Sequence, residues 1–395
     1  MKLKYLIALI PLIIISCTEP YALETENFED LLVVEATITD EYKKQNIKLS
    51  RTIPIEQSSP NIEHGASVKI TTDTGLEFLF QEENDIYISN QEFRIEAGIN
   101  YTLHIQTVNG NSYISTNEKM PTTVEIESVN AIQKAENSIS GVEININSND
   151  PTNTAKFYRY EFEETYKIIP PYWSPNKLEI GPNEELIVSP RTTETQICYS
   201  SDYSKTINVT TTENQTEDRL YNYKVHFLPK DDPKITNRYS ILVKQYIQNV
   251  GAYNFYKTLK NLSSTGSLLS QVQPGFIEGN IKNTNNSDEK IVGYFDVTTV
   301  SKKRIFFNFN DIFPLELSSD YFHECNAILY TTATDYLSPF DVTHFGARLD
   351  LINGVLSNQI IYYTHDSFSG DYTMVYPECG DCTTFSSNIE PDFWQ

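Results

Sequence analysis

Residues 32–39, Leu-Val-Val-Glu-Ala-Thr-Ile-Thr, are the stretch of sequence that decides the fold. Val34, Ala36 and Ile38 fall on one face of an extended chain, and the polar Glu35 and Thr37 fall on the other. A period of two over eight residues is typical of a β-strand with one buried face. The chain therefore begins its folded part with a half-buried strand.

The same alternation returns several times in the next hundred or so residues. It recurs at Ile47 and Leu49, at Val68 and Ile70, at Phe78 and Phe80, and at Tyr101, Leu103 and Ile105. Asn109-Gly110, before Tyr113-Ile114, is a strong hairpin signal. About seven short strands separated by turn signals predict an antiparallel β-sandwich resembling the immunoglobulin type, over residues 29–123, with no disulfide to support it.

The second region, residues 124–395, is predicted to be a larger β-rich domain with a C-terminal cysteine loop. Met120-Pro121-Thr122-Thr123 marks the exit from the sandwich. One stretch departs from the strand pattern: between 252 and 262, Tyr253, Tyr256 and Leu259 recur at helical spacing. The predicted fold class is mainly β, with an N-terminal immunoglobulin-like sandwich, a larger β-rich domain and about one packed helix.

The first sixteen residues have the layout of an export signal. Lys2 and Lys4 precede an apolar run from residue 5 to residue 15, which is too short to span a membrane. Ile14-Ile15-Ser16-Cys17 fits the pattern that bacterial lipoprotein processing requires, so we expect lipidation at Cys17. Residues 17–28, which are polar and aperiodic, are predicted to be a lipidated tether holding the protein at a membrane.

The charge balance argues against a nucleic-acid partner. The chain has 53 acidic and 30 basic residues, and its longest basic run is the short Lys302-Lys303-Arg304. An acidic surface favours solubility and repulsion from anionic lipid headgroups. A patch reserved for a cation or a basic ligand is the alternative.

The cysteines predict covalent cross-links. Beyond Cys17 the chain has Cys198, Cys325, Cys379 and Cys382, and an even number in an exported protein indicates two disulfides, with three pairings open. The Cys379-x-x-Cys382 spacing could also be half of a zinc site or a redox pair. Further zinc ligands are not close in sequence, and Pro377 and Gly380 favour a loop over the helix start that a redox motif uses.

No catalytic pattern emerges from the sequence. Asp73-Thr74-Gly75 matches the aspartic-protease triplet, but it has no second copy and lies between two alternating runs, where a hairpin turn is expected. The six histidines are scattered, and neither a Gly-x-Ser-x-Gly elbow nor a Gly-rich phosphate loop occurs. We expect no enzymatic activity, no cofactor and no metal.

An aromatic cluster is the best candidate for contact with a ligand or partner. It consists of Tyr158, Tyr160, Tyr166, Tyr172 and Trp173. Tyr158 and Tyr160 alternate with charged residues as in an ordinary strand, so core packing is expected for them. Tyr172 and Trp173 directly follow two prolines and are predicted to form an exposed contact for a sugar, a peptide or a protein.

Several blocks in order give the chain a family resemblance. They are Arg238-Tyr239-Ser240-Ile241 with Gln245-Tyr246, Ala252-Tyr253 and the helix after it, Gly279-Asn280-Ile281, Gly293-Tyr294-Phe295, Arg304-Ile305-Phe306, Pro377-x-Cys379-x-x-Cys382 and Pro391-Asp392-Phe393-Trp394. With the lipidation pattern and the first strand, the series resembles the lipoprotein family of domain of unknown function 4249, typical of Bacteroidota, over nearly the whole mature chain. Cys198-Tyr199 stands where the family often has Cys-Trp, and the segment after Cys382 is less Gly-rich than usual.

The resemblance implies a location and a partner, and it supplies no catalytic residues. Such proteins are outer-membrane lipoproteins, commonly encoded beside TonB-dependent receptors that carry a carboxypeptidase-regulatory-like sandwich. Thr18 after the lipidated cysteine favours the outer membrane over the inner, and the acids that follow resemble a surface-export signal, with the periplasmic face as the alternative.

Three functional hypotheses follow. The first is a non-enzymatic accessory or binding subunit that works with a TonB-dependent receptor in substrate capture or uptake. The second is a structural or assembly subunit of an outer-membrane complex for secretion, assembly or motility. The third is a hydrolase whose site is assembled from distant residues of the second region.

Overall fold

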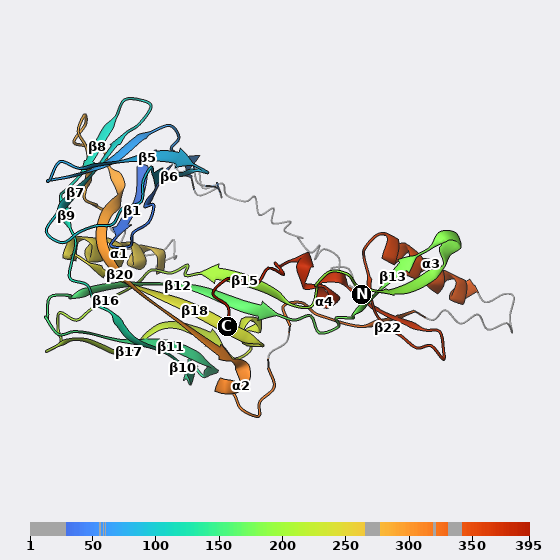
Figure 1. Ribbon diagram of the computed structural model, residues 1–395. Helices are drawn as coiled ribbons and strands as arrows, with labels where there is room; N and C mark the ends of the chain where they lie inside the picture. The colour runs from blue at the N-terminus through green and yellow to red at the C-terminus, as the bar shows by residue number, and fades with distance from the viewer. Residues whose placement is uncertain are drawn as a thin grey trace, which may run out of the picture.

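The structure is a computed structural model, and it describes residues 29–395 except 55, 56, 58, 60, 265–276, 319–320 and 331–341. The export signal, Cys17 and the tether therefore lie outside the described residues. The protein is mainly β, as the sequence predicts, and Figure 1 shows its arrangement.

The N-terminal part consists of short strands in one continuous run of pairings. Their bounds are β1 (Leu32–Thr39), β2 (Asn46–Arg51), β3 (Asn61–Ile62), β4 (Ser67–Thr72), β5 (Glu77–Glu83), β6 (Ile86–Ser89), β7 (Asn100–Gln106), β8 (Ser112–Ser115) and β9 (Glu118–Lys119). The alternating residues of β1 are buried as expected, with Leu32, Val34, Ala36 and Ile38 each at most 2% exposed. Burial of this face is the main force that holds the strand in register.

Both predicted turns of this part are present. Asp73-Thr74-Gly75 joins β4 to β5, which pair in antiparallel register, and Gly75 has a φ of 88°. The carboxylate of Asp73 accepts hydrogen bonds from the backbone and the side chain of Asn100, so it serves the turn. Asn109-Gly110 lies between β7 and β8. The hairpin interpretation of the triplet is confirmed.

The second region supplies the remaining strands and the helices. The strands are β10 (Ile126–Glu136), β11 (Ile139–Asp150), β12 (Phe157–Ile168), β13 (Asn176–Ile180), β14 (Leu186–Pro190), β15 (Cys198–Tyr203), β16 (Asn208–Thr211), β17 (Asp218–Pro229), β18 (Arg238–Gln248), β19 (Ile281–Asn283), β20 (Ile291–Asn308), β21 (Ile328–Tyr330), β22 (Ile361–His365) and β23 (Tyr372–Val375). The α-helices are α1 (Val250–Ser264), α2 (Phe309–Ile312), α3 (Val342–Leu356) and α4 (Pro377–Gly380), with short 3₁₀ turns at Pro182–Glu184, Pro233–Ile235 and Cys382–Thr384. The helix predicted over 252–262 is α1, and the other three were not foreseen.

Strand β20 connects the two halves of the molecule. Its first half runs parallel to β1, from Leu32 opposite Ile291 to Thr39 opposite Thr298. Its second half runs antiparallel to β18, from Thr299 to Asn308. Together with β19, which pairs with β8, it contributes Phe295 and neighbouring residues to the N-terminal core. The sheet therefore crosses the predicted boundary between residues 123 and 124, and the division into domains stays a prediction.

Three residues shape the junction between β1 and β20. Gly293 has a φ of 154°, and a Cβ there would lie 2.3 Å from the carbonyl oxygen of Val34. A Cβ on Gly279 would lie 1.6 Å from the carbonyl oxygen of Gly293, so both positions require glycine. Beside them the amide of Asn280 bonds to both backbone groups of Phe295, at 2.8 and 3.0 Å. The chain thus approaches itself too closely here for side chains.

A second core lies between two sheets of the second region. The sheet β10-β11-β17 contributes Ile144 and Leu228, and the strands β12 and β18 contribute Tyr158 and Ile241. Figure 1 shows these sheets below the N-terminal strands, with α1 between them. Tyr158 and Tyr160 are at most 1% exposed, which confirms their predicted core role.

The C-terminal part is a smaller unit with its own core. Hairpin β13-β14, helix α3 and the sheet β21-β23-β22 share a hydrophobic cluster that includes Leu178, Leu351 and Met374. Residues 176–190 form that hairpin, with Asn176 opposite Pro190. Among the described residues, no helix is both long and apolar enough to cross a bilayer.

Candidate functional site

A cleft of about 860 Å³ lies in the corner between β1 and the strands β12 and β18. Its walls come from β1 and β2 on one side and from β12, β18, helix α1 and the 203–208 segment on the other. Its volume is within the range of small-molecule sites. The corner forms because β20 pairs first with β1 and then with β18. The cleft therefore joins distant parts of the sequence.

The alternation of β1 explains one wall. Because Val34 and Ala36 point into the N-terminal core, the intervening Val33, Glu35 and Thr37 point to the opposite face, and all three line the cleft. Glu35 is exposed and lies opposite Lys48 of β2 in the strand register. The face of β1 that points away from the N-terminal core thus forms one wall of the cleft.

A buried arginine forms the floor on the other side. Arg159 lies between the rings of Tyr246 and Tyr256, at 4.3 and 4.6 Å from their centroids. Its guanidinium pairs with Glu161 and lies 3.9 Å from Asp296. Burial of this kind is tolerated because cation–π contacts and acidic partners replace water.

Asp296 is the buried acid behind this floor. It is fully buried, and one carboxylate oxygen accepts a hydrogen bond from Gln248 at 2.9 Å, while the other has no hydrogen-bond partner among the residues that the structure describes. Burial raises the pKa of Asp296 to about 6, against the opposing effect of Arg159. The pair anchors the floor, and Asp296 is not among the residues lining the cleft.

The lining is basic although the chain is acidic. Five cationic side chains line the cleft, and only two acidic ones do; the cations are Lys43, Lys48, Arg159, Lys205 and Lys244, and the acids are Glu35 and Glu161. Lys43 pairs with Glu41 at 2.7 Å, and Lys244 lies 3.9 Å from Glu163. Within the part of the chain that the structure describes, Lys48 and Lys205 have no ion-pair partner within 4.0 Å.

The predicted aromatic contact lies elsewhere. Tyr172 and Trp173 are both half-buried. Tyr172 meets the ring of Tyr363 edge-on at 5.2 Å, and the indole N–H of Trp173 donates to Thr195 at 3.1 Å. Tyr172 also lines a hollow of about 540 Å³ with residues 321–326. The structure thus leaves part of Tyr172 accessible, and whether it contacts a partner stays a prediction.

All four cysteines of the second region form disulfides. Cys198 pairs with Cys382, and Cys325 pairs with Cys379. The two cysteines of the Cys-x-x-Cys motif therefore have different distant partners, which favours the structural interpretation over a zinc site or a redox pair. The motif begins in the short helix α4, where a loop was expected.

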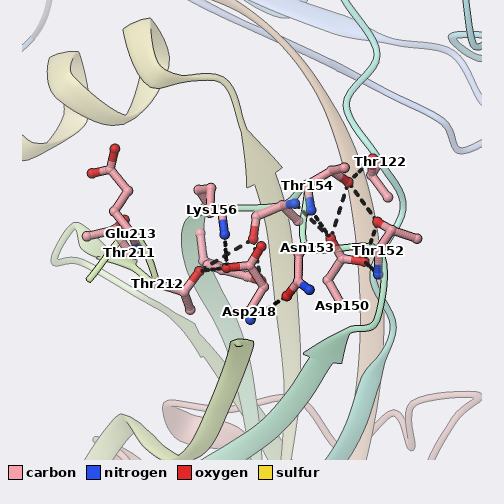
Figure 2. A network of polar contacts seen from close by, with 12 residues as sticks. Thr122, Asp150, Thr152, Asn153, Thr154, Lys156, Thr211, Thr212, Glu213 and Asp218 are labelled. Carbon is pink, nitrogen blue, oxygen red and sulfur yellow. Dashed lines mark hydrogen bonds and ion pairs between the residues drawn. The ribbon is translucent and has the colours of Figure 1, made fainter. Parts of the chain in front are cut away.

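A polar network around Asp150 supports a turn. Figure 2 shows Asp150 facing Thr152 and Thr154, with Lys156 and Asp218 nearby. Burial raises the pKa of Asp150, but hydrogen bonds from Thr152 and from three backbone N–H groups outweigh it and lower the pKa to about 2. Asp218 accepts from Lys156 at 2.6 Å. These carboxylates hold the segments around residues 150 and 218 together.

One cluster on the surface has metal-ligand chemistry. His64, Glu82 and Asp85 place one ligand atom each within 4.8 Å of one another near the β5-β6 turn. Glu82 already accepts hydrogen bonds from the backbone of Gly65 and from Tyr87, and the cluster is largely exposed. Hydrogen bonds between Glu82 and His64, Gly65 and Tyr87 account for this arrangement.

Of the aromatic cluster singled out from the sequence, Tyr160 lines the cleft, and the other cleft residues were not identified as a site. Arg159 gave a usable signal, because a charged residue between the buried Tyr158 and Tyr160 must find partners within the fold. Lys48 and Lys205 gave no signal, since each is an ordinary surface lysine in its own segment. They come together only through the pairing of β1 with β20.

Comparison with known protein families gives a match. The family model described as "Domain of unknown function (DUF4249)" matches residues 18–304, which is more than half of the chain. The matched range contains every residue that lines the cleft. No curated protein matches the chain.

Proposed function

The chain belongs to the DUF4249 family, and from this premise we propose that it is a non-enzymatic binding lipoprotein of the outer membrane that works with a TonB-dependent receptor in substrate capture or uptake. Lipidation at Cys17 holds the protein at the membrane, on the cell surface. The cleft between β1 and β12–β18 is its binding site.

The observation that carries the proposal is the cleft itself. It is open, has the volume of a ligand site, and combines charged, hydroxyl and aromatic side chains. Among its described lining residues there is no histidine or cysteine that could act as a base or a nucleophile.

The anchor supports the location. The Ile14-Ile15-Ser16-Cys17 pattern predicts a lipidated terminus, and the polar tether would allow the folded part to stand away from the bilayer. Two disulfides fit an oxidising compartment outside the cytoplasm. The receptor partner is inferred from the family resemblance.

The test is a mild-detergent pull-down from membranes through a tag placed after Gln395. We expect a large TonB-dependent barrel protein to be recovered with the wild-type chain. The matched control is Cys17→Ala, which keeps the folded part and should lose both membrane association and the partner. Recovery of the chain alone would contradict the proposal, and recovery with secretion or assembly factors would favour the structural-subunit alternative.

A further inference from the structure

We infer that the cleft binds an acidic saccharide, one whose sugar units carry carboxylate or sulfate groups. This inference rests on the proposed function, because it takes the cleft as the binding site and adds the chemical class of the ligand. Three features of the cleft lead to it: the charge of its lining, its accessible aromatic and polar groups, and the interior position of the strands β1 and β18 in the sheet.

The sign of the charge is the first feature. The whole chain has a net charge of −23, yet cations outnumber acids in the lining by five to two. Three of these cations, Lys43, Arg159 and Lys244, lie beside Glu41, Glu161 and Glu163, and their charges are balanced there. The positive charge that can attract an anionic ligand therefore comes from the remaining two lysines.

Two lysines are available for a ligand. Lys48 comes from β2, and Lys205 comes from the segment between β15 and β16, so the two walls contribute one each. Both are exposed, and among the described residues neither has an acidic group within ion-pair distance. By contrast, Arg159 is already neutralised by Glu161. A ligand with two or more anionic groups could pair with both lysines at once.

The uncharged lining suits a sugar. Tyr203 is 63% exposed on the rim of the cleft, which leaves a ring face free for the C–H face of a sugar. Asn46 and Thr206 are exposed lining residues that can hydrogen-bond to hydroxyl groups. An aromatic surface beside amide and hydroxyl groups is a common way to bind a polyol.

The strand pairing argues against an acidic peptide. Extended peptides are usually recognised by adding a strand to a free sheet edge. The two long strands β1 and β18 are interior ones: β1 pairs with β2 and β20, and β18 pairs with β12 and β20. Their backbone groups are therefore already used, so a peptide along these two strands would meet side chains only. The edge strands β15 and β16 bring Tyr203 and Asn208 to the cleft, and the peptide probe below tests strand addition there.

The test is calorimetric titration of the full lipidated protein in detergent. The probes are a tetragalacturonate, a chondroitin sulfate tetrasaccharide, the neutral maltotetraose and a tetraglutamate peptide. We expect at least one acidic saccharide to bind, with affinity that falls as salt increases, and the neutral sugar and the peptide to bind at least about tenfold more weakly.

Variants connect binding to the cleft. Lys48→Gln and Lys205→Gln should each weaken binding of the acidic saccharide about tenfold, the effect of losing one charge-assisted hydrogen bond. Glu35→Gln should strengthen it a few-fold, because an acid beside Lys48 is removed. Lys282→Gln on β19, an exposed lysine outside the cleft, is the matched control and should change nothing.

Three results would overturn the inference: binding of neither acidic saccharide, preference for the neutral sugar or the peptide, or equal effects of Lys48→Gln and Lys282→Gln. The pull-down with the receptor is independent of these titrations. If the barrel is recovered but the acidic saccharides do not bind, the ligand class is wrong and the proposed function stands. If acidic saccharides bind and no barrel is recovered, the partner is wrong and the ligand class stands.

Discussion

The longest cross-link in the structure gives the most quantitative prediction. The Cys198–Cys382 disulfide spans 184 residues, and the Cys325–Cys379 disulfide spans 54. Loop-closure entropy in the unfolded chain then assigns about 5 kcal/mol to the first and about 4 kcal/mol to the second. Replacing both cysteines of the longer bridge by alanine should therefore cost about 1 kcal/mol more than the same change in the shorter one.

Packing acts in the same direction. Cys198 and Cys382 are both fully buried in the core of the second region, whereas Cys325 is only half-buried. Truncation in a core leaves a cavity, so the loss for the longer bridge should exceed its entropic part. The ranking of the two double variants thus follows from two independent causes.

Tryptophan fluorescence during urea unfolding can measure this ranking. The chain has two tryptophans, and both lie near the longer bridge. Trp394 packs edge-on against Tyr199 at 4.9 Å, and Trp173 donates to Thr195. We expect the unfolding midpoint to fall furthest in Cys198→Ala/Cys382→Ala. An equal or larger fall in Cys325→Ala/Cys379→Ala would refute the reasoning.

Two further predictions concern the polar contacts of the fold. In thermal unfolding, Asn280→Ala should lower the free energy of unfolding by about 2 kcal/mol, because the backbone N–H and C=O of Phe295 lose their partner. The control Asn90→Ala, on the surface, should change this free energy by less than about 0.5 kcal/mol. Asp150 has a folded-state pKa of about 2, below the ordinary 3.8, so its stabilisation of about 2 kcal/mol is present above about pH 4 and is lost as the pH falls towards 2. In an acid titration of stability, Asp150→Asn should lack this part of the pH dependence. An unchanged acid transition would argue against the hydrogen bonds drawn in Figure 2.

Local patterns predicted much of the fold. The period of two in residues 32–39 and in the strands after it identified the N-terminal β structure, and the helical spacing of Tyr253, Tyr256 and Leu259 identified α1. These signals work because each element buries one face, and the burial pattern is written into adjacent residues. The short helices α2 and α4 span one turn each, which is too little for a periodic pattern.

Long-range pairing could not be predicted in the same way. The parallel contact between β1 and β20 joins residues more than 250 positions apart, and neither strand carries a local mark of its partner. Gly279 and Gly293 require glycine because another part of the chain approaches them closely, but a glycine in the sequence does not show which part that is. The cleft depends on this pairing, so its residues were not recognisable beforehand.

The location of the folded part on the cell surface can be tested by treating intact cells with chymotrypsin. Phe368 is fully exposed in the turn between β22 and β23, so cleavage there should release residues 369–395. The disulfides of Cys379 and Cys382 should retain this fragment until the sample is reduced. If the C-terminal tag is found on a small fragment only after reduction, a folded, oxidised protein faces the medium, as substrate capture requires. Protection in intact cells, with cleavage only after the outer membrane is permeabilised, would contradict the surface-capture account.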